Sequence, residues 1–98
     1  MTPAEIATVA VRVLRDARNL IAAMPAHPFH GSALQAISSA AWVGEQAVSV
    51  RASNRRRWAV KALAQAVPTD LTAWDSDLTV TQNDVLAAFD SAIQMTAA

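Results

Sequence analysis

The sequence predicts an all-α protein: a compact bundle of four helices with a long Trp-anchored link before the last helix. Three observations lead to this prediction. The chain is rich in Ala, the strongest helix former, and has only two Gly among its 98 residues. Apolar residues recur every three or four positions, which is the spacing of one helical face. The four Pro lie at the start of the chain or between these periodic segments. At this length the chain is expected to be a single helical domain, residues 1–98.

The first helix is predicted to run from Pro3 to about Met24. Thr2 and Glu5 have the spacing of a capping box, and Pro at the first helical position is a start signal. One side of the predicted helix is apolar and consists of Ile6, Val9, Ala10, Val13, Ala17, Leu20 and Met24, with Leu14 and Ile21 at its edge. The other side carries Arg12, Arg15, Asp16 and Asn19. Residues 25–31 form a loop, because two Pro and a Gly exclude regular structure there.

A second helix is predicted from Ala33 to about Val50, with Ser32 as its cap. Its apolar stripe consists of Leu34, Ile37, Ala41, Gly44 and Val48. Trp42 lies off this stripe, among polar residues. Ser53 or Asn54 is expected to cap a third helix, which continues to about Val67 and ends before a Pro. The core face of the third helix consists of Ala59, Leu63, Ala66 and Val67.

Residues 68–81 are predicted to form a polar link rich in Asp and Thr. A link of this length needs an anchor, and Trp74 is the expected one. Part of 78–80 is expected to be extended. Thr81 and Asp84 then cap the last helix. Its inner face consists of Val85, Leu86, Phe89, Ala92 and Ile93.

Charge is divided along the chain. Residues 1–61 contain all eight basic residues and three acidic ones, a net charge of +5, whereas residues 62–98 contain five Asp and no basic residue, a net charge of −5. Such an asymmetry informs on partners and assembly rather than on the fold. The 53% hydrophobic content is high for a small monomer, and it points in the same direction, toward self-association.

Composition excludes several classes of protein. The chain has no Cys, so disulfides, thiolate metal sites and thiol nucleophiles are excluded. Arg12, Arg15 and Arg18 interrupt the first apolar segment, which therefore does not resemble a membrane span. The N-terminus lacks the basic and apolar regions of a signal peptide. A cytoplasmic protein with no membrane partner is expected.

The run from Ser53 to Trp58 is the sharpest local feature, because it places three Arg together at the predicted start of a helix. Arg55, Arg56 and Arg57, with Arg51 and Lys61 nearby, bring five positive charges beside a Trp. One interpretation is an anion-binding surface. A second is a helix-turn-helix whose recognition helix follows Ser53, although the near-neutral pI is unlike that of a dedicated DNA-binding domain. A third is that these Arg form a solvated helix start, or pair with the chain's own Asp70, Asp75 and Asp77.

No pattern predicts a catalytic, metal or cofactor site. Asp75 and Asp77 have alternating spacing, but the Gly and the closing Glu of a calcium loop are missing, so a solvated acidic loop is expected. His27 and His30 have no further metal ligand nearby and no nucleophile partner, because Ser32 is accounted for as a cap. We therefore expect neither an enzyme nor a small-molecule substrate.

Trp42 and Trp58 are candidate contact residues. Each lies off the main apolar stripe of its predicted helix, and exposed Trp beside Arg is typical of the residues that dominate protein–protein binding energy. Core packing is the alternative for both rings.

The last quarter of the chain has a pattern that resembles one found in other proteins. Residues 71–77, with Trp74 and Asp75, precede a Thr-containing link and a helix beginning around Asp84. This ending resembles that of a family of small uncharacterised helical proteins from actinobacteria and their phages. Members of that family tend to have a Trp-Asn-Asp turn, from which residues 74–77 depart. The resemblance implies an accessory phage or actinobacterial protein, with Trp74 as a structural anchor, and transfers no active site.

These observations together predict a non-enzymatic protein-interaction or regulatory module that binds an acidic partner or associates with itself. The predicted contact surface consists of Arg51, Arg55, Arg56, Arg57, Lys61, Trp42 and Trp58. The alternative is a small helix-turn-helix-like DNA-binding regulator that uses the helix following Ser53.

Overall fold

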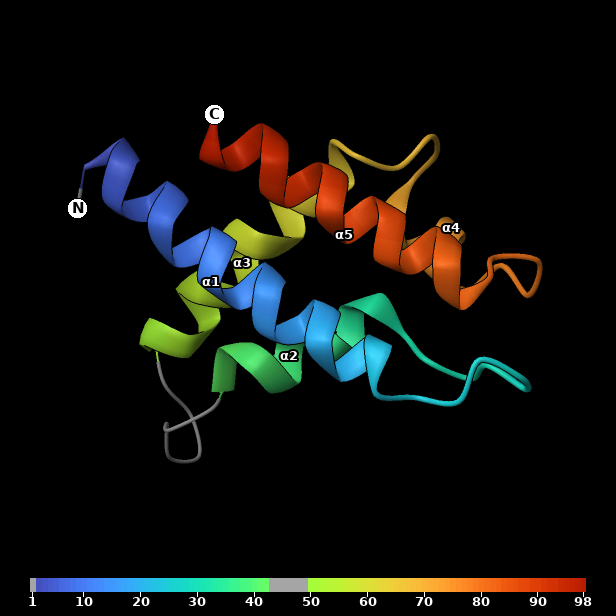
Figure 1. Ribbon diagram of the computed structural model, residues 1–98. Coiled ribbons are helices and arrows are strands. Elements are labelled where there is room, and N and C mark those ends of the chain that lie inside the picture. The colour runs from blue at the N-terminus through green and yellow to red at the C-terminus, as the bar shows by residue number, and fades with distance from the viewer. Residues whose placement is uncertain (1, 43–49) are drawn as a thin grey trace.

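The computed structural model describes residues 2–42 and 50–98, and within these ranges all regular structure is helical (Figure 1). The helices are α1 (Pro3–Ala22), α2 (Ala33–Trp42), α3 (Val50–Ala64), α4 (Leu71–Asp75) and α5 (Gln82–Ala97). The all-α class is therefore confirmed. The described residues form five helices rather than the four predicted, because a short helix, α4, lies inside the segment expected to be an irregular link.

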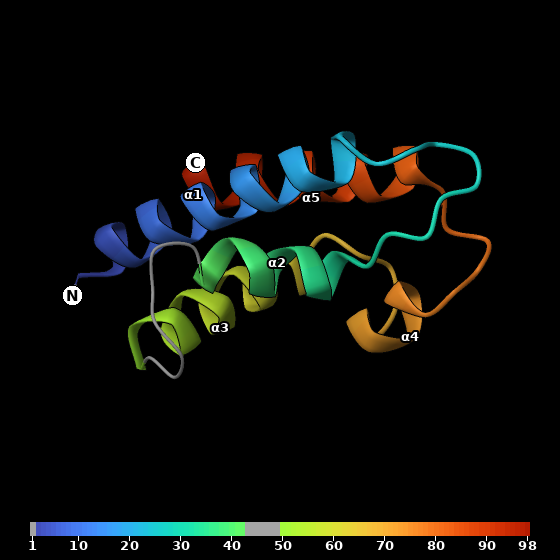
Figure 2. The same cartoon turned by 90° about the horizontal axis from the view of Figure 1, so that it is seen from below.

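The helices are arranged in two layers, with α1 at the centre of the packing. α1 and α5 lie side by side and antiparallel in one layer, and α2, α3 and α4 lie in the other (Figures 1 and 2). α1 contacts α5, α2 and α3, so most of the core forms around it. The radius of gyration, 12.8 Å, is close to the value of about 13 Å expected for a compact domain of this length.

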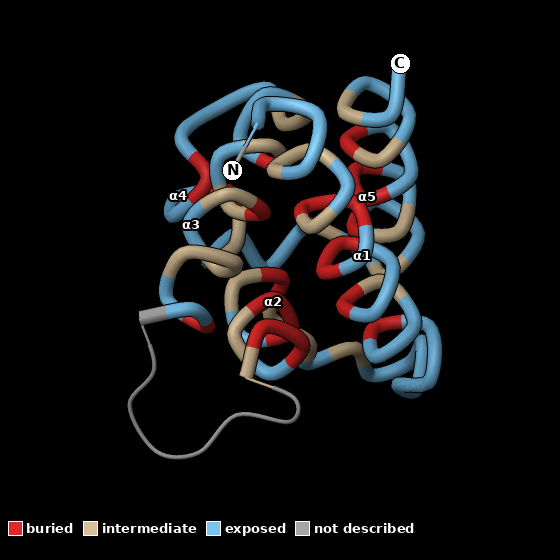
Figure 3. The backbone as a smooth tube through the Cα atoms, turned by 90° about the vertical axis from the view of Figure 1, so that its left-hand side faces the viewer, coloured by how far each residue is buried: buried red, intermediate tan, exposed pale blue. Residues whose placement is uncertain are grey.

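The core consists of one cluster of side chains contributed by all five helices. Its largest fully buried members are Leu14, Ile21, Ile37, Leu63 and Phe89. Figure 3 shows the buried segments of the long helices facing one another across the layers. Most of the remaining buried positions are Ala, which lets the helix backbones approach closely.

The buried face of α1 differs from the predicted one. Leu14 and Ile21, expected at the edge, are fully buried, whereas Leu20 and Met24 are 42% and 37% exposed. Because α1 contacts three helices, its buried surface turns toward the side where Leu14 and Ile21 lie. The predicted polar side is exposed as expected.

The sequence predicted the N-terminal caps of three helices correctly. The Thr2 hydroxyl accepts a hydrogen bond from the Glu5 amide at 3.2 Å and caps α1. Thr81 and Asp84 form a complete capping box at the start of α5. Ser32 Oγ accepts a hydrogen bond from the Gln35 amide at 3.2 Å at the start of α2.

The prediction for α3 was wrong at both ends. The described part of this helix begins at Val50, so Ser53 and Asn54 lie inside it and do not cap it. The helix ends at Ala64, and Ala66 and Val67 pack against the core from beyond its end. The predicted continuation of the second helix, with Gly44 and Val48, lies outside the described residues.

The predicted polar link before α5 contains a short helix and a turn. Asp70 caps α4 by accepting a hydrogen bond from the Ala73 amide at 3.1 Å. Trp74 of α4 is buried and belongs to the core cluster. Residues 78–80, part of which was expected to be extended, form a turn closed by a hydrogen bond from the Val80 amide to the Asp77 carbonyl at 3.2 Å.

Candidate functional site

The Arg run lies in the interior of α3 and not at its start. Because α3 includes Val50 and Arg51, the residues Arg55, Arg56 and Arg57 are at least a full turn inside it. They therefore do not oppose the partial positive charge of a helix N-terminus, and the argument from a recognition helix that opens with Arg no longer applies.

Two of these arginines connect α3 to α2. The Arg55 guanidinium donates two hydrogen bonds to the carbonyl of Ala41, from Nε at 3.1 Å and from Nη2 at 2.7 Å. The Nε of Arg56 donates a hydrogen bond to the Ser38 hydroxyl at 2.8 Å. Arg55 and Arg56 thus have a structural role, which the sequence did not reveal because their acceptors are a backbone carbonyl and a hydroxyl rather than carboxylates.

The chain's own aspartates, the predicted alternative partners of the Arg run, are bonded elsewhere. Asp70 caps α4, and Asp75 accepts hydrogen bonds from the Ser32 hydroxyl and the Ala33 amide, both at 2.6 Å. Asp77 accepts from the amide and the hydroxyl of Thr79, at 2.8 and 2.7 Å. These bonds lower the pKa of Asp77, the Thr79 hydroxyl having the largest effect. The expectation of a solvated acidic loop was therefore wrong for Asp75, which lies at the end of α4 and caps α2.

A groove between α2, α3 and the start of α4 brings together several of the predicted contact residues. It has a volume of about 830 Å³, and we call it the cationic groove. The apolar part of its lining includes Leu34, Trp42, Val60 and Leu71, and the charged part consists of Arg56, Arg57, Lys61 and Asp70. Three cations and one carboxylate therefore surround an apolar surface that includes an indole ring.

The two off-stripe tryptophans lie in different places. Trp42 is partly buried, packs against the core and lines the cationic groove. Trp58 is also partly buried, but it lines a different groove with Ile6 and Met95, between α1, α3 and α5. The prediction that grouped both rings in one surface therefore does not match the geometry.

The seven residues of the predicted contact surface therefore do not lie together. Trp42, Arg56, Arg57 and Lys61 line the cationic groove. Arg51 is exposed in the first described turn of α3, and Arg55 is bonded to α2. The residues that the sequence missed are Leu34, Val60 and Asp70. Leu34 was predicted as part of the apolar stripe of the second helix, Val60 was not singled out, and Asp70 was considered only as a partner of the Arg run.

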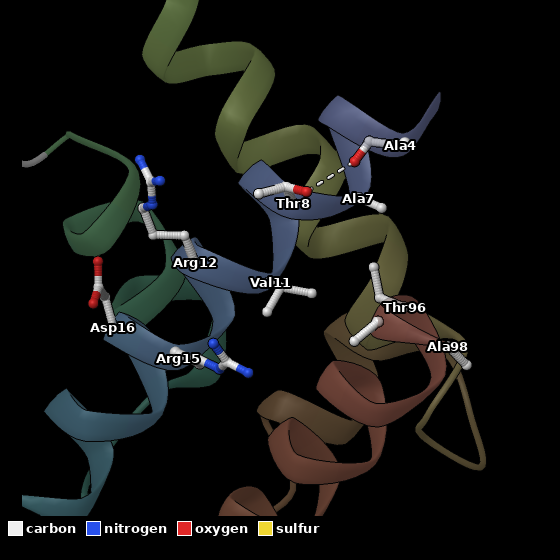
Figure 4. A pocket seen from close by; sticks show the side chains of 10 residues that line it. Ala4, Ala7, Thr8, Val11, Arg12, Arg15, Asp16, Thr96 and Ala98 are labelled. Carbon is white, nitrogen blue, oxygen red and sulfur yellow. Dashed lines mark hydrogen bonds between the residues drawn. The ribbon is translucent and has the colours of Figure 1, made fainter. Parts of the chain in front are cut away.

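A further groove lies between the N-terminal half of α1 and the C-terminal end of α5 (Figure 4). Its volume is about 540 Å³, and its lining includes small side chains of both helices together with Arg12, Arg15 and Asp16. In Figure 4, Arg12 and Asp16 lie on one side of α1 and Thr96 lies on the other, and the Thr8 hydroxyl is bonded to the Ala4 carbonyl at 3.0 Å. Its polar groups do not converge on one point, as those of a ligand site do.

Among residues 2–42 and 50–98 there is no group of three or more His, Cys, Asp or Glu that could hold a metal ion. His27 and His30 are exposed in the loop after α1. None of the described helices is both long enough and apolar enough to cross a membrane. No protein-family model matches the chain, and neither a curated protein nor a solved structure is significantly similar to it.

Proposed function

We propose that this protein is a non-enzymatic interaction module whose cationic groove binds an acidic, partly apolar segment of a protein partner. The observation that carries the proposal is the position of Trp42 beside Arg56, Arg57 and Lys61 in one groove. The four long helices form the bundle that holds this groove, and Trp74 anchors the segment that completes it. The accessory phage or actinobacterial role implied by the resemblance stays a prediction.

The chemistry of the groove suits a peptide. Leu34, Trp42 and Val60 supply apolar surface, and burial of such surface drives association. Trp and Arg are the residue types that most often dominate binding energy at protein interfaces. Arg57 and Lys61 are exposed, so they are available to attract carboxylates and to orient the partner.

A protein partner is favoured over DNA by the way α3 is held in the fold. Arg55 and Arg56 are bonded to α2, so the face of α3 that carries them packs on a neighbouring helix and does not project as a recognition helix does.

Fluorescence anisotropy with a short labelled peptide of Glu and Leu tests the proposal. We expect binding at low salt, weakened at high salt because exposed charges are screened. The double substitution Arg57→Glu and Lys61→Glu is expected to weaken binding by at least about tenfold, which corresponds to about 1.4 kcal/mol. The matched control is Arg12→Glu with Arg15→Glu, which changes the net charge equally but lies at the α1–α5 groove.

The control variant should bind like the wild type, and circular dichroism should show both variants to be folded. A labelled DNA duplex is measured in parallel. Absence of peptide binding at low salt would overturn the proposal. Tight binding of the duplex, lost in the Arg57 and Lys61 variant, would establish the DNA-binding alternative instead.

A further inference from the structure

The turn between α4 and α5 presents a leucine whose side chain is fully exposed. Leu78 has a relative exposure of 100%. Isolated exposed apolar residues are common on proteins, so exposure alone carries no argument. This leucine differs because the turn around it is held in one shape. Oδ1 of Asp77 accepts two hydrogen bonds from Thr79, and the Val80 amide donates to the Asp77 carbonyl at 3.2 Å.

The turn therefore presents an apolar side chain next to a negative charge in a preformed arrangement. Asp and Asn side chains stabilise turns by such bonds to the residue two positions on. Only Oδ1 of Asp77 takes part in the bonds to Thr79. A preformed turn loses less conformational entropy on docking than a mobile loop. This is the acidic and partly apolar chemistry that suits the cationic groove.

The position of the turn is fixed from both sides, away from the groove of its own chain. On one side Asp75 is bonded to Ser32 and Ala33, and on the other the Gln82 side chain is bonded to the carbonyls of Ile21 and Met24. Figure 2 shows the turn beyond α4, on the side away from α3. It borders a separate hollow, near the loop after α1, that shares no lining residue with the cationic groove.

We propose that the turn 77–80 of one copy docks into the cationic groove of a second copy, with Leu78 against Trp42 and Asp77 beside Arg57 and Lys61. This inference rests on the proposed function and names its partner. The turn belongs to the part of the chain with net charge −5 and the groove mainly to the part with net charge +5, so two copies are complementary head to tail. A total charge of zero leaves no net repulsion between copies.

Because the turn and the groove are different surfaces, the contact is heterologous. Each copy uses its turn on one neighbour and its groove on another, which produces a ring if the rotation closes and an open filament if it does not. A two-fold symmetric dimer would instead bring the same surface of both copies together.

Analytical ultracentrifugation of two complementary variants tests this arrangement. Leu78→Arg removes the docking turn and leaves the groove, and Arg57→Glu alters the groove and leaves the turn. At low salt the wild type is expected to form species larger than dimers as concentration rises. Each variant alone is expected to remain monomeric. An equimolar mixture is expected to form dimers and nothing larger, because one functional turn and one functional groove remain in it.

Arg12→Glu is the control for Arg57→Glu, because it makes the same change in net charge at a position away from the turn and the groove. This control variant should associate like the wild type. A monomeric wild type over the whole concentration range, or a mixture that stays monomeric, would overturn the inference. If the wild type is monomeric but binds the acidic peptide through Arg57 and Lys61, the inference fails and the proposed function stands. If the mixture dimerises but the peptide does not bind, the groove is specific for this turn and the general acidic-partner function fails.

Discussion

Asp75, at the end of α4, accepts a hydrogen bond at 2.6 Å from the backbone amide of Ala33, the first residue of α2. Its second oxygen accepts from the Ser32 hydroxyl, also at 2.6 Å. The first amides of a helix have no partner within the helix, and a carboxylate there also interacts favourably with the helix dipole. A side chain from the segment before α5 therefore caps a helix far away in the sequence, and it connects α4 to α2 within the layer that carries the cationic groove.

Replacing Asp75 by Ala is expected to lower the free energy of unfolding by about 1–2 kcal/mol, the usual effect of losing a helix cap. Urea denaturation followed by circular dichroism measures the change. Asp16→Ala is the matched control, because Asp16 is exposed on α1, and its effect should stay within about 0.5 kcal/mol. Equal midpoints for the two variants would contradict a capping role for Asp75.

How far the sequence predicts this structure depends on how local each signal is. Thr2, Ser32 and Thr81 were identified as caps because their partners lie three residues away. The cap supplied by Asp75 depends on a contact between two separate helices, so no local pattern contains it. The cap signal at Ser53 and Asn54 was misleading, because the helix continues through them and places Arg55 and Arg56 where they reach α2.

The same distinction applies to the candidate site. Residue types and charge identified Arg57, Lys61 and Trp42, all of which line the cationic groove. The groove itself lies between α2, α3 and the start of α4, and the sequence contains no local signal for the way these helices pack together. Trp58 looked equivalent to Trp42, but it lies on α3 at a groove formed with α1 and α5.

Gln82 is expected to stabilise the contact between α5 and α1. Its Nε2 donates hydrogen bonds to the carbonyls of Ile21 and Met24, at 2.9 and 2.7 Å, at the end of α1. Gln82→Glu replaces this donor by a carboxylate that faces two carbonyl oxygens, so a loss of about 1–3 kcal/mol in the free energy of unfolding is expected. Thermal unfolding at neutral pH measures it, and recovery at a pH low enough to protonate the Glu supports the explanation. The exposed Gln94→Glu is the control, and an equal effect there would contradict it.

The hydrogen bonds to Asp77 lead to a prediction about the pKa of its carboxyl group. Hydrogen bonds from Thr79, first from its hydroxyl and then from its amide, lower the pKa of Asp77 below its ordinary value of 3.8. A lowered pKa in the folded state means that the ionised group stabilises the fold above the unfolded-state pKa and that this contribution is lost as the pH falls through the lowered value. Thr79→Val removes the hydroxyl and keeps the amide. The pKa of Asp77, followed by NMR of its carboxyl carbon, is expected to rise part of the way toward 3.8, and an unchanged pKa would contradict the assignment.

Arg55 and Arg57, two residues apart on α3, are expected to respond differently to the same substitution. Two N–H groups of Arg55 meet the Ala41 carbonyl, and a Lys has one flexible ammonium group that does not reproduce this fork. Arg55→Lys therefore keeps the charge but is expected to lower the free energy of unfolding by about 1–2 kcal/mol. Arg57→Lys should change it by less than about 0.5 kcal/mol, because Arg57 is exposed. Urea denaturation measures both, and equal stabilities would show that Arg55 does not hold α3 on α2.

The effect of Arg57→Lys on binding is a separate prediction. This substitution keeps the positive charge at the cationic groove, so the variant is expected to retain most of the affinity for the acidic peptide.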